Sequence, residues 1–418
     1  MGIFKNKNFT LLFLGRIVSN IGDSLYAVAA MWLVYDLGGS TFYTGLAGFL
    51  SFFPRIVQLL AGPFVDRIPI RSLLVYSQLI QAVLLLIVPI ASYFDHLTVA
   101  LVLIITPILT TLNMFMFPAQ MAALPTFVEE KDLSRGNSLF TLAYQGIDIA
   151  CNAVSGILIV MAGAISIYVL DAAAFLLGAY VFSLIQIPSK KAVPVITETK
   201  PKYFSELKDG VRMILFTPLA RLLYGIILVN LAMGATFVVL PAFGKIMGGA
   251  ETYGLLLTAQ AIGSLAGAMA APYIKLDYIP IGKLYAAAFC LSGIAWGLSI
   301  FSSWNWLAVV LFGLACIPGA VTNIAINTVI QKAIPEKLLG RVFSAVMSLS
   351  GIAFPLGGLA GGTLGVVIGA ELIILISGII TFLTGIAWII DPVTRKLPPS
   401  KEIDSTVFEV GKVVGYGA

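Results

Sequence analysis

The chain is a succession of long apolar segments separated by short polar breaks. A hydrocarbon core of about 30 Å needs roughly 20 helical residues, so an apolar run of 18 or more residues predicts a membrane-spanning helix. Twelve such helices are predicted, at residues 11–36, 43–65, 72–94, 97–118, 138–162, 165–187, 218–243, 252–274, 281–301, 304–330, 342–368 and 370–390. The pattern therefore predicts an all-α membrane protein without a sizeable soluble domain.

Composition supports this interpretation and excludes several functions. Of 418 residues, 59% are hydrophobic and 11% charged, whereas about a quarter are charged in soluble domains. The three cysteines are far apart inside apolar runs, and the single histidine, His96, falls in a predicted outer loop, so neither a disulfide framework nor a zinc site is expected. The sequence contains no GxxxxGK[ST] phosphate-binding loop. We expect no cofactor, no metal and no enzymatic activity, and any active transport would use an ion gradient.

Basic residues indicate the orientation, because Lys and Arg in short loops are retained on the cytoplasmic side. With the N-terminus inside, most of the 25 basic residues fall on inner segments. Their spread over many loops argues against a nucleic-acid patch, despite the net charge of +5. We expect a monomeric multi-pass protein of the plasma membrane, surrounded by lipid, with both termini cytoplasmic.

The predicted helices divide six and six around residues 188–217, where charge and proline concentrate. This segment is predicted to be a cytoplasmic linker carrying an interfacial helix, or alternatively a solvated linker. The predicted domains are an N-terminal bundle (1–187), the linker (188–217), a C-terminal bundle (218–391) and a cytoplasmic tail (392–418). A weak repeat, QGIDIACNAVSG ending at Gly156 and SGIAFPLGGLAG ending at Gly361, has the same topology in both halves. Two pseudo-symmetric six-helix bundles are therefore expected.

Ionisable residues inside predicted spans are the main candidates for chemistry, because charges in a bilayer are costly and usually functional. Asp23 lies near the middle of the first helix, on one face with Arg16 and Asn20. Asp148 lies within the fifth helix. Asp171 lies nearer the outer end of the sixth, where it would face an outer vestibule and either serve transport or pack helices together.

We rank Asp23 first and Asp148 second for proton coupling, because a coupling carboxyl must be reachable from both sides in turn. Arg55 in the second helix could neutralise either acid, or could extend toward the inner headgroups. The alternative role for Asp23 is a structural pair with an arginine that holds helices together.

Helices 1, 4, 7 and 10 are expected to line a central cavity. Mainly apolar lining with scattered amides and aromatic rings suits bulky lipophilic ligands, although amides also hold membrane helices together. The predicted lining residues are Arg16, Asn20, Tyr26, Asn113, Phe115, Gln145, Asn230, Phe237, Asn323 and Asn327.

The stretch GPFVDRIPIR, starting at Gly62, resembles the loop signature of the major facilitator superfamily. Gly62, Asp66, Arg67 and Arg71 match the signature, whereas Pro69 and Ile70 stand in place of its second Gly and one Arg. The resemblance implies that the matching residues close an inner gate. The alternative is an ordinary positively charged inner loop.

Further stretches are similar to the branch of this superfamily that contains macrolide-efflux and enterobactin-export proteins. They are SNIGDSLYAVAAMWLVYDL in the first helix, PAQMAALPTFVEEKDLSRGN and QKAIPEKLLGRVFS. GIDIACNAVSG resembles the antiporter signature of drug exporters, with Cys151 and Asn152 replacing its Gly and Pro.

This resemblance implies a secondary transporter that exports lipophilic or amphipathic small molecules by alternating access, coupled to protons, as in multidrug resistance. The alternatives are a siderophore or metabolite exporter of the same fold, a non-transporting receptor, and an intramembrane enzyme.

Overall fold

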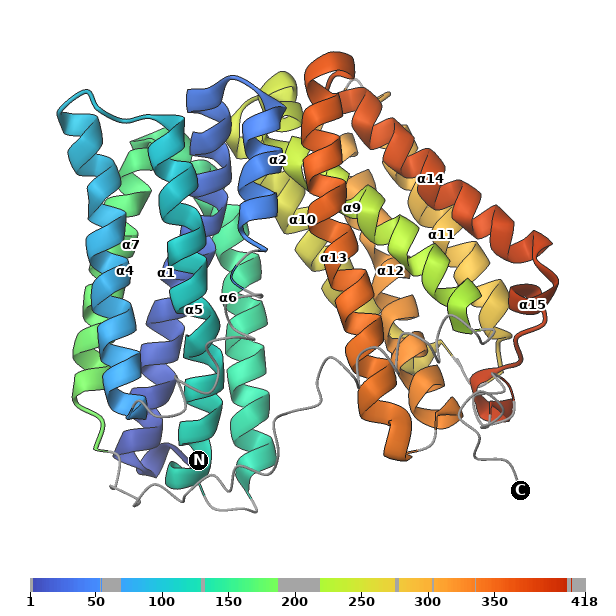
Figure 1. Cartoon of the computed structure of the whole chain (residues 1–418), viewed down its shortest axis with the longest axis horizontal. Coiled ribbons are helices and arrows are strands. Elements are labelled where there is room, and N and C mark those ends of the chain that lie inside the picture. The colour runs from blue at the N-terminus through green and yellow to red at the C-terminus, as the bar shows by residue number, and fades with distance from the viewer. Residues whose placement is uncertain are drawn as a thin grey trace. The chain divides into compact units, whose positions relative to one another are not determined.

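The computed structural model describes residues 3–52, 54, 69–128, 132–186, 219–274, 278–302, 304–334, 336–403 and 407, and these residues are almost wholly helical (Figure 1). In the first half the helices are η1 (Ile3–Lys5), α1 (Lys7–Gly38), α2 (Thr41–Leu50), α4 (Ile70–Tyr93), α5 (Val99–Phe127), α6 (Leu133–Ala162) and α7 (Ala164–Ser183). In the second half they are α9 (Leu219–Met247), α10 (Ala250–Ala270), η3 (Ala271–Tyr273), α11 (Ile281–Ser299), α12 (Asn305–Ala333), α13 (Glu336–Ile368), α14 (Ala370–Ile390), α15 (Pro392–Arg395) and η4 (Ser400–Glu402).

Each of the twelve predicted spans overlaps one of these helices, and the all-α membrane fold is confirmed. Within the described residues, nine helices are long and apolar enough to cross a membrane. Several helices run past their apolar part. For example, α13 starts at Glu336 and not near 342, because polar residues can continue a helix beyond the hydrocarbon region. The predicted interfacial helix in 188–217 lies outside the described residues.

The chain divides into two compact units. The first unit comprises Met1–Val193 and Pro241–Thr258, and the second comprises Pro194–Leu240 and Ala259–Ala418. The C-terminal end of α9 and the first part of α10 thus belong to the first unit. Within it, the Lys245 ammonium lies 3.4 Å from the Asp36 carboxylate, and Trp32 stacks on Tyr253 with ring centroids 6.0 Å apart.

In the first unit, α7 packs against both α1 and α4. Small residues allow this close approach, since Gly15 and Gly22 on α1 lie directly beneath Phe182 and Phe175 of α7. A cluster of buried apolar side chains, including Phe9, Leu74 and Phe140, continues the packing at the end of the bundle near the N-terminus. Membrane helices associate through such van der Waals contact, because lipid gives no hydrophobic drive between them.

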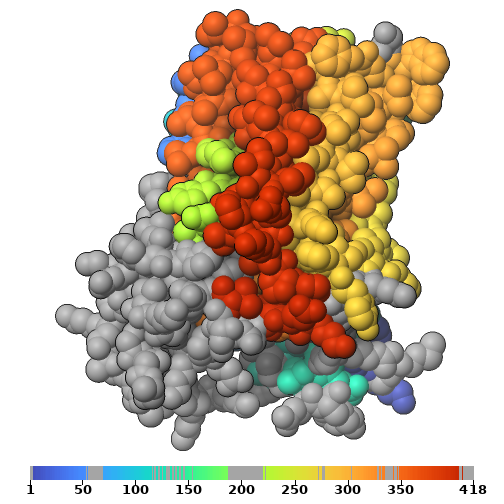
Figure 2. All heavy atoms as spheres, turned by 90° about the vertical axis from the view of Figure 1, so that its right-hand side faces the viewer, coloured from blue at the N-terminus to red at the C-terminus, as the bar shows by residue number. Residues whose placement is uncertain are grey.

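In the second unit, α14 lies beside α11, as Figure 2 shows for α14 in red and α11 in yellow. Gly293 on α11 and Gly378 on α14 meet backbone to backbone. Nearby, Tyr285 stacks on Trp388 with centroids 4.7 Å apart. The segment after α14 folds back over this end of the unit, where Leu397 and Ile403 join the buried core.

Candidate functional site

A polar cluster surrounds the middle of α1 in the first unit. The Asp23 carboxylate accepts a hydrogen bond from the Asn113 side chain on α5, and it interacts electrostatically with Arg16, two turns earlier on α1. The polar face predicted for the first helix is therefore directed at neighbouring helices. Asp23 itself is only partly buried.

Arg16 is almost completely buried, with 3% of its surface exposed. Its Nη1 donates to Oε1 of Gln120 on α5 over 2.9 Å, and its guanidinium lies 5.2 Å from the centroid of the Tyr144 ring on α6. A buried charge is tolerated only when it is paired and hydrogen-bonded. Gln120, the Tyr144 ring and the charge of Asp23 meet that requirement for Arg16.

Asp148 on α6 is joined to the same region of α1. Its Oδ1 accepts a hydrogen bond from Ser24 Oγ over 3.2 Å, and the carboxyl also bonds with the Asn152 side chain one turn later. Because Ser24 follows Asp23 directly, one turn of α1 connects both carboxyl groups. Of the two acids that the sequence ranks first, Asp148 is thus bonded to the residue that follows Asp23.

Asp171 on α7 is fully buried, and within the described part of the chain neither of its carboxyl oxygens has a hydrogen-bond partner. The predicted exposure to an outer vestibule is therefore wrong. The reason is that Asp171 lies on the face of α7 that packs into the bundle, one turn from Tyr168. The Tyr168 ring lies 5.7 Å from that of Tyr26, whose hydroxyl donates to Thr106 Oγ1 over 2.9 Å.

The remaining predicted residues of the first half have varied places. Asn20 is buried in α1, and its amide atoms have no partner among the described residues. Arg71 is exposed at the start of α4 and donates to the backbone oxygen of Ser183. The structure does not describe four of the predicted residues, Arg55, Gly62, Asp66 and Arg67. For Phe115 and Gln145 it describes the helical backbone but not the side chain.

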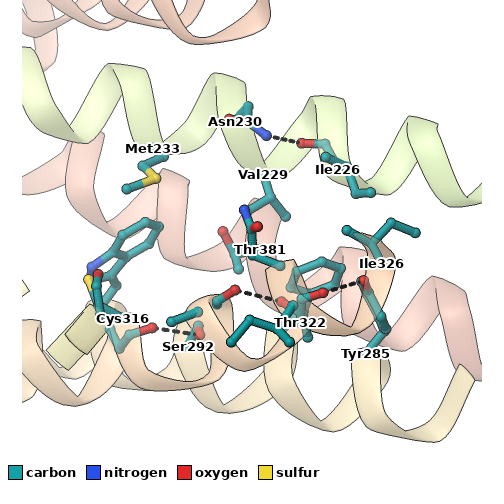
Figure 3. A pocket seen from close by; sticks show the side chains of 18 of the residues that line it. Ile226, Val229, Asn230, Met233, Tyr285, Ser292, Cys316, Thr322, Ile326 and Thr381 are labelled. Carbon is teal, nitrogen blue, oxygen red and sulfur yellow. Dashed lines mark hydrogen bonds between the residues drawn. The ribbon is translucent and has the colours of Figure 1, made fainter. Parts of the chain in front are cut away.

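The second unit contains a cavity of about 420 Å³ between α9, α10, α11, α12 and α14 (Figure 3). Two residues predicted from sequence, Asn230 and Asn323, line it. Phe237 is not among the lining residues, and its ring lies 5.8 Å from that of Phe354 on α13. The side chain of Asn327 lies outside the described residues.

Sequence reasoning missed one wall of this cavity, formed by Tyr285, Phe289, Ser292 and Trp296 on α11. Their spacing places them on one helical face, and this signal was available in the sequence. Aromatic residues at helical spacing usually belong to the packed core, so the pattern by itself does not predict a cavity wall. Of the lining residues that the structure describes, none is Asp, Glu, Lys, Arg or His.

Apolar helices of membrane-spanning length, a set of intramembrane carboxyl groups and a separate uncharged cavity define a multi-pass membrane transport protein. The sequence profile of the family described as transmembrane secretion effector matches residues 1–409, and the chain belongs to this family of the major facilitator superfamily. The predicted resemblance is confirmed. Members of the family are transporters and not enzymes.

Similar proteins cover most of the chain. The uncharacterised MFS-type transporter YvqJ of Bacillus subtilis is 23% identical, over 91% of each chain. The multidrug efflux pump Tap of Mycolicibacterium fortuitum is 26% identical, over 93% of this chain and 96% of that protein. Macrolide efflux protein A of Streptococcus pyogenes is 23% identical, over 84% and 87% respectively.

Solved structures share the fold. A crystal structure of a point mutant of the nucleoside transporter NupG superposes with a TM-score of 0.70 at 14% identity, covering 92% of this chain and 99% of that one.

Among the residues that the structure describes, no group of three or more His, Cys, Asp or Glu side chains could hold a metal ion.

Proposed function

We propose that this protein exports lipophilic or amphipathic small molecules across the plasma membrane by alternating access, driven by the inward flow of protons. The observation that carries the proposal is the set of carboxyl groups around the middle of α1, where Asp23 and Asp148 are joined through adjacent residues of one helix. Ionisable residues at this depth are costly and typically mark proton or substrate pathways.

Asp23 is proposed as the principal protonation site, with Asp148 as its alternative. Asp23 is partly buried, and it is linked to Arg16 by charge and to Asn113 by a hydrogen bond. Protonation would remove its charge and so weaken its attraction for Arg16. Because the two residues lie on the helix that contacts α5, α6 and α7, this change could bias the packing of the bundle.

Two further features support export of lipophilic compounds. The names of two relatives, a multidrug efflux pump and a macrolide efflux protein, describe export of drugs. The cavity in the second unit is lined mainly by apolar and aromatic side chains, which suits such ligands better than ions or sugars.

Transport in inverted membrane vesicles tests this function. Vesicles that contain the protein should accumulate a lipophilic dye when their lumen is made more acidic than the medium. A protonophore should abolish the accumulation. Vesicles without the protein are the control. Equal accumulation in both preparations would contradict drug export, and an untargeted comparison of compounds released by cells with and without the protein would then identify a metabolite substrate.

A further inference from the structure

The cavity of the second unit has the size of a small-molecule site. Its volume of about 420 Å³ falls within the roughly 300–1,000 Å³ of typical ligand pockets. All of its lining residues belong to one unit, and α11 and α14 supply part of the wall. It therefore extends among helices that were not expected to line a central cavity.

The lining specifies an uncharged ligand. Among the described residues that line it, only Tyr285 and Cys316 are ionisable, and their side chains are neutral at physiological pH. Moving a charged group out of water into such surroundings is costly without a paired opposite charge. Met233, Phe289 and Trp296 offer instead a polarisable apolar surface.

Three hydroxyl groups that line the cavity donate hydrogen bonds to backbone oxygens of the protein. Ser292 donates to the backbone oxygen of Ala315 over 2.7 Å, and Tyr285 donates to that of Thr322 over 2.5 Å (Figure 3). The Thr381 hydroxyl donates to the oxygen of Ser377 in its own helix over 2.8 Å. These hydroxyl oxygens can still accept hydrogen bonds, but their hydrogens are already used.

Trp296 differs from these groups. Its side chain lines the cavity, only 4% of its surface is exposed, and its indole Nε1 has no hydrogen-bond partner within the described part of the chain. A buried indole N–H usually finds an acceptor, because leaving it unpaired costs free energy. An oxygen atom of a bound ligand that reached this N–H from the cavity would satisfy it.

We propose that this cavity binds an uncharged, mainly apolar small molecule of drug size whose oxygen accepts a hydrogen bond from Trp296. This inference rests on the proposed export function, since it names the substrate class for that function. The ligand contains no fixed charge, and its apolar body lies against Phe289 and Met233. Asn230, whose Nδ2 donates to the oxygen of Ile226 over 2.9 Å, offers its amide oxygen as an acceptor to the same ligand.

Equilibrium binding of Nile red to the full-length protein in lipid nanodiscs tests the assignment, with binding to empty nanodiscs subtracted. Nile red is uncharged, planar and apolar, and it carries a carbonyl oxygen. A side chain at Gly319 should occupy the cavity without a clash, because a Cβ built there meets no atom within 4 Å. We expect Gly319→Leu to weaken Nile red binding by about tenfold or more.

A second variant tests the hydrogen bond. Trp296→Phe retains an aromatic ring but removes the N–H group, and it should weaken Nile red binding about three- to tenfold. Leu314→Phe is the matched control, because Leu314 is exposed on α12 and does not line the cavity. It should leave binding unchanged. Tetraphenylphosphonium, a lipophilic cation, should compete poorly with Nile red at this site.

The outcomes separate this inference from the proposed function, because binding is measured without a gradient. If Gly319→Leu and Trp296→Phe bind Nile red as tightly as the wild type does, the cavity is not the site, even if vesicles still export the dye. If tetraphenylphosphonium binds more tightly than Nile red and Gly319→Leu loses this binding, the proposal that the ligand is uncharged is wrong. If Nile red binds to the wild type and both cavity variants weaken this binding, but no gradient drives transport, the result supports the site and contradicts the coupling mechanism.

Discussion

Individual polar residues on α1 connect the helices of the first unit. Asp23 bonds with Asn113 on α5, Ser24 with Asp148 on α6, and Tyr26 with Thr106 on α5. In a membrane each of these groups would be costly if left unpaired. Two of these contacts, those of Asp23 and Asp148, would therefore also change if the carboxyl group gained a proton.

Gln120 is predicted to support Arg16. Gln120→Leu removes the acceptor of the buried 2.9 Å bond from Arg16 Nη1, and it should lower the free energy of unfolding by about 1–3 kcal/mol, the typical cost of an unpaired buried donor. Thr110→Val is the matched control on α5, because among the described residues the Thr110 hydroxyl donates to the backbone oxygen of Thr106 in the same helix and to no other helix. Thermal unfolding in detergent measures both variants. Equal unfolding temperatures for the two would show that Gln120 does not stabilise Arg16.

The candidate residues could be predicted more readily than their partners. Helical spacing places Arg16 and Asp23 on one face, and the cost of intramembrane charge marks both as important. Spacing cannot show which neighbouring helix that face contacts, so Gln120 was missed. The same limit explains the wrong placement of Asp171, whose buried orientation depends on how α7 packs.

At the scale of helices, the contact between α11 and α14 depends on glycine. A Cβ built on Gly293 would lie 2.5 Å from the backbone oxygen of Gly378 and from the nitrogen of Phe382. Backbone atoms cannot move aside as a flexible side chain can. The two helices must therefore separate if either position becomes larger.

We predict that Gly293→Ala lowers the free energy of unfolding by about 1–3 kcal/mol, as is typical when a well-packed contact is overfilled. Gly297→Ala, one turn later on the same helix, is the control. Its Cβ would meet only Leu375 Cδ1 at 3.8 Å, which is ordinary contact, and alanine favours the helix. Unfolding temperatures in detergent should therefore fall for Gly293→Ala alone. A fall of the same size for both variants would contradict the close packing.

The ends of α9 and α14 are joined by an ion pair between Arg221 and Asp391. Partial burial raises the pKa of Asp391, but hydrogen bonds from the backbone and hydroxyl of Thr394 and the charge of Arg221 outweigh it, so the pKa lies below its ordinary value. A carboxylate with a lowered pKa stabilises the folded state above its unfolded pKa of about 3.9. This contribution is lost as the pH falls through the lower folded pKa.

Asp391→Asn should therefore be less stable than the wild type at pH 5–7, and the difference should shrink as the pH falls below about 4. Both side chains are partly exposed, so the effect should be small and should weaken in high salt. Unfolding temperatures measured across this pH range at low and high salt check the prediction. A difference that stays constant down to pH 3 would show that the charge of Asp391 does not stabilise the folded state.

For the whole molecule, the sequence predicted the fold well because the membrane restricts the possible structures. Only helices and closed barrels can span lipid, so long apolar runs specify helices almost directly. Exact helix ends, such as the start of α13 at Glu336, could not be predicted, because residues outside the hydrocarbon region have no such restriction. The cavity in the second unit depends on packing among five helices, which spacing alone does not reveal.

The proposed topology places both termini and residues 188–217 in the cytoplasm. In a variant whose three cysteines are replaced by alanine, a single cysteine at Thr197 should react with a membrane-impermeant maleimide only in inverted vesicles. A cysteine at His96, between α4 and α5, should react in intact cells. This expectation follows from the concentration of basic residues in the inner loops. Labelling of the Thr197 position in intact cells would contradict the proposed orientation.

Proton-driven export through Asp23 is the central claim, and its most direct test is transport by Asp23→Asn in inverted vesicles under an imposed proton gradient. Asparagine keeps the shape of the side chain and its hydrogen bonding with Asn113, but it cannot gain or lose a proton. The variant should fold and bind Nile red as the wild type does, yet it should not accumulate dye against a gradient. Accumulation by Asp23→Asn with the pH dependence of the wild type would contradict the claim, and Asp148→Asn would become the variant to measure.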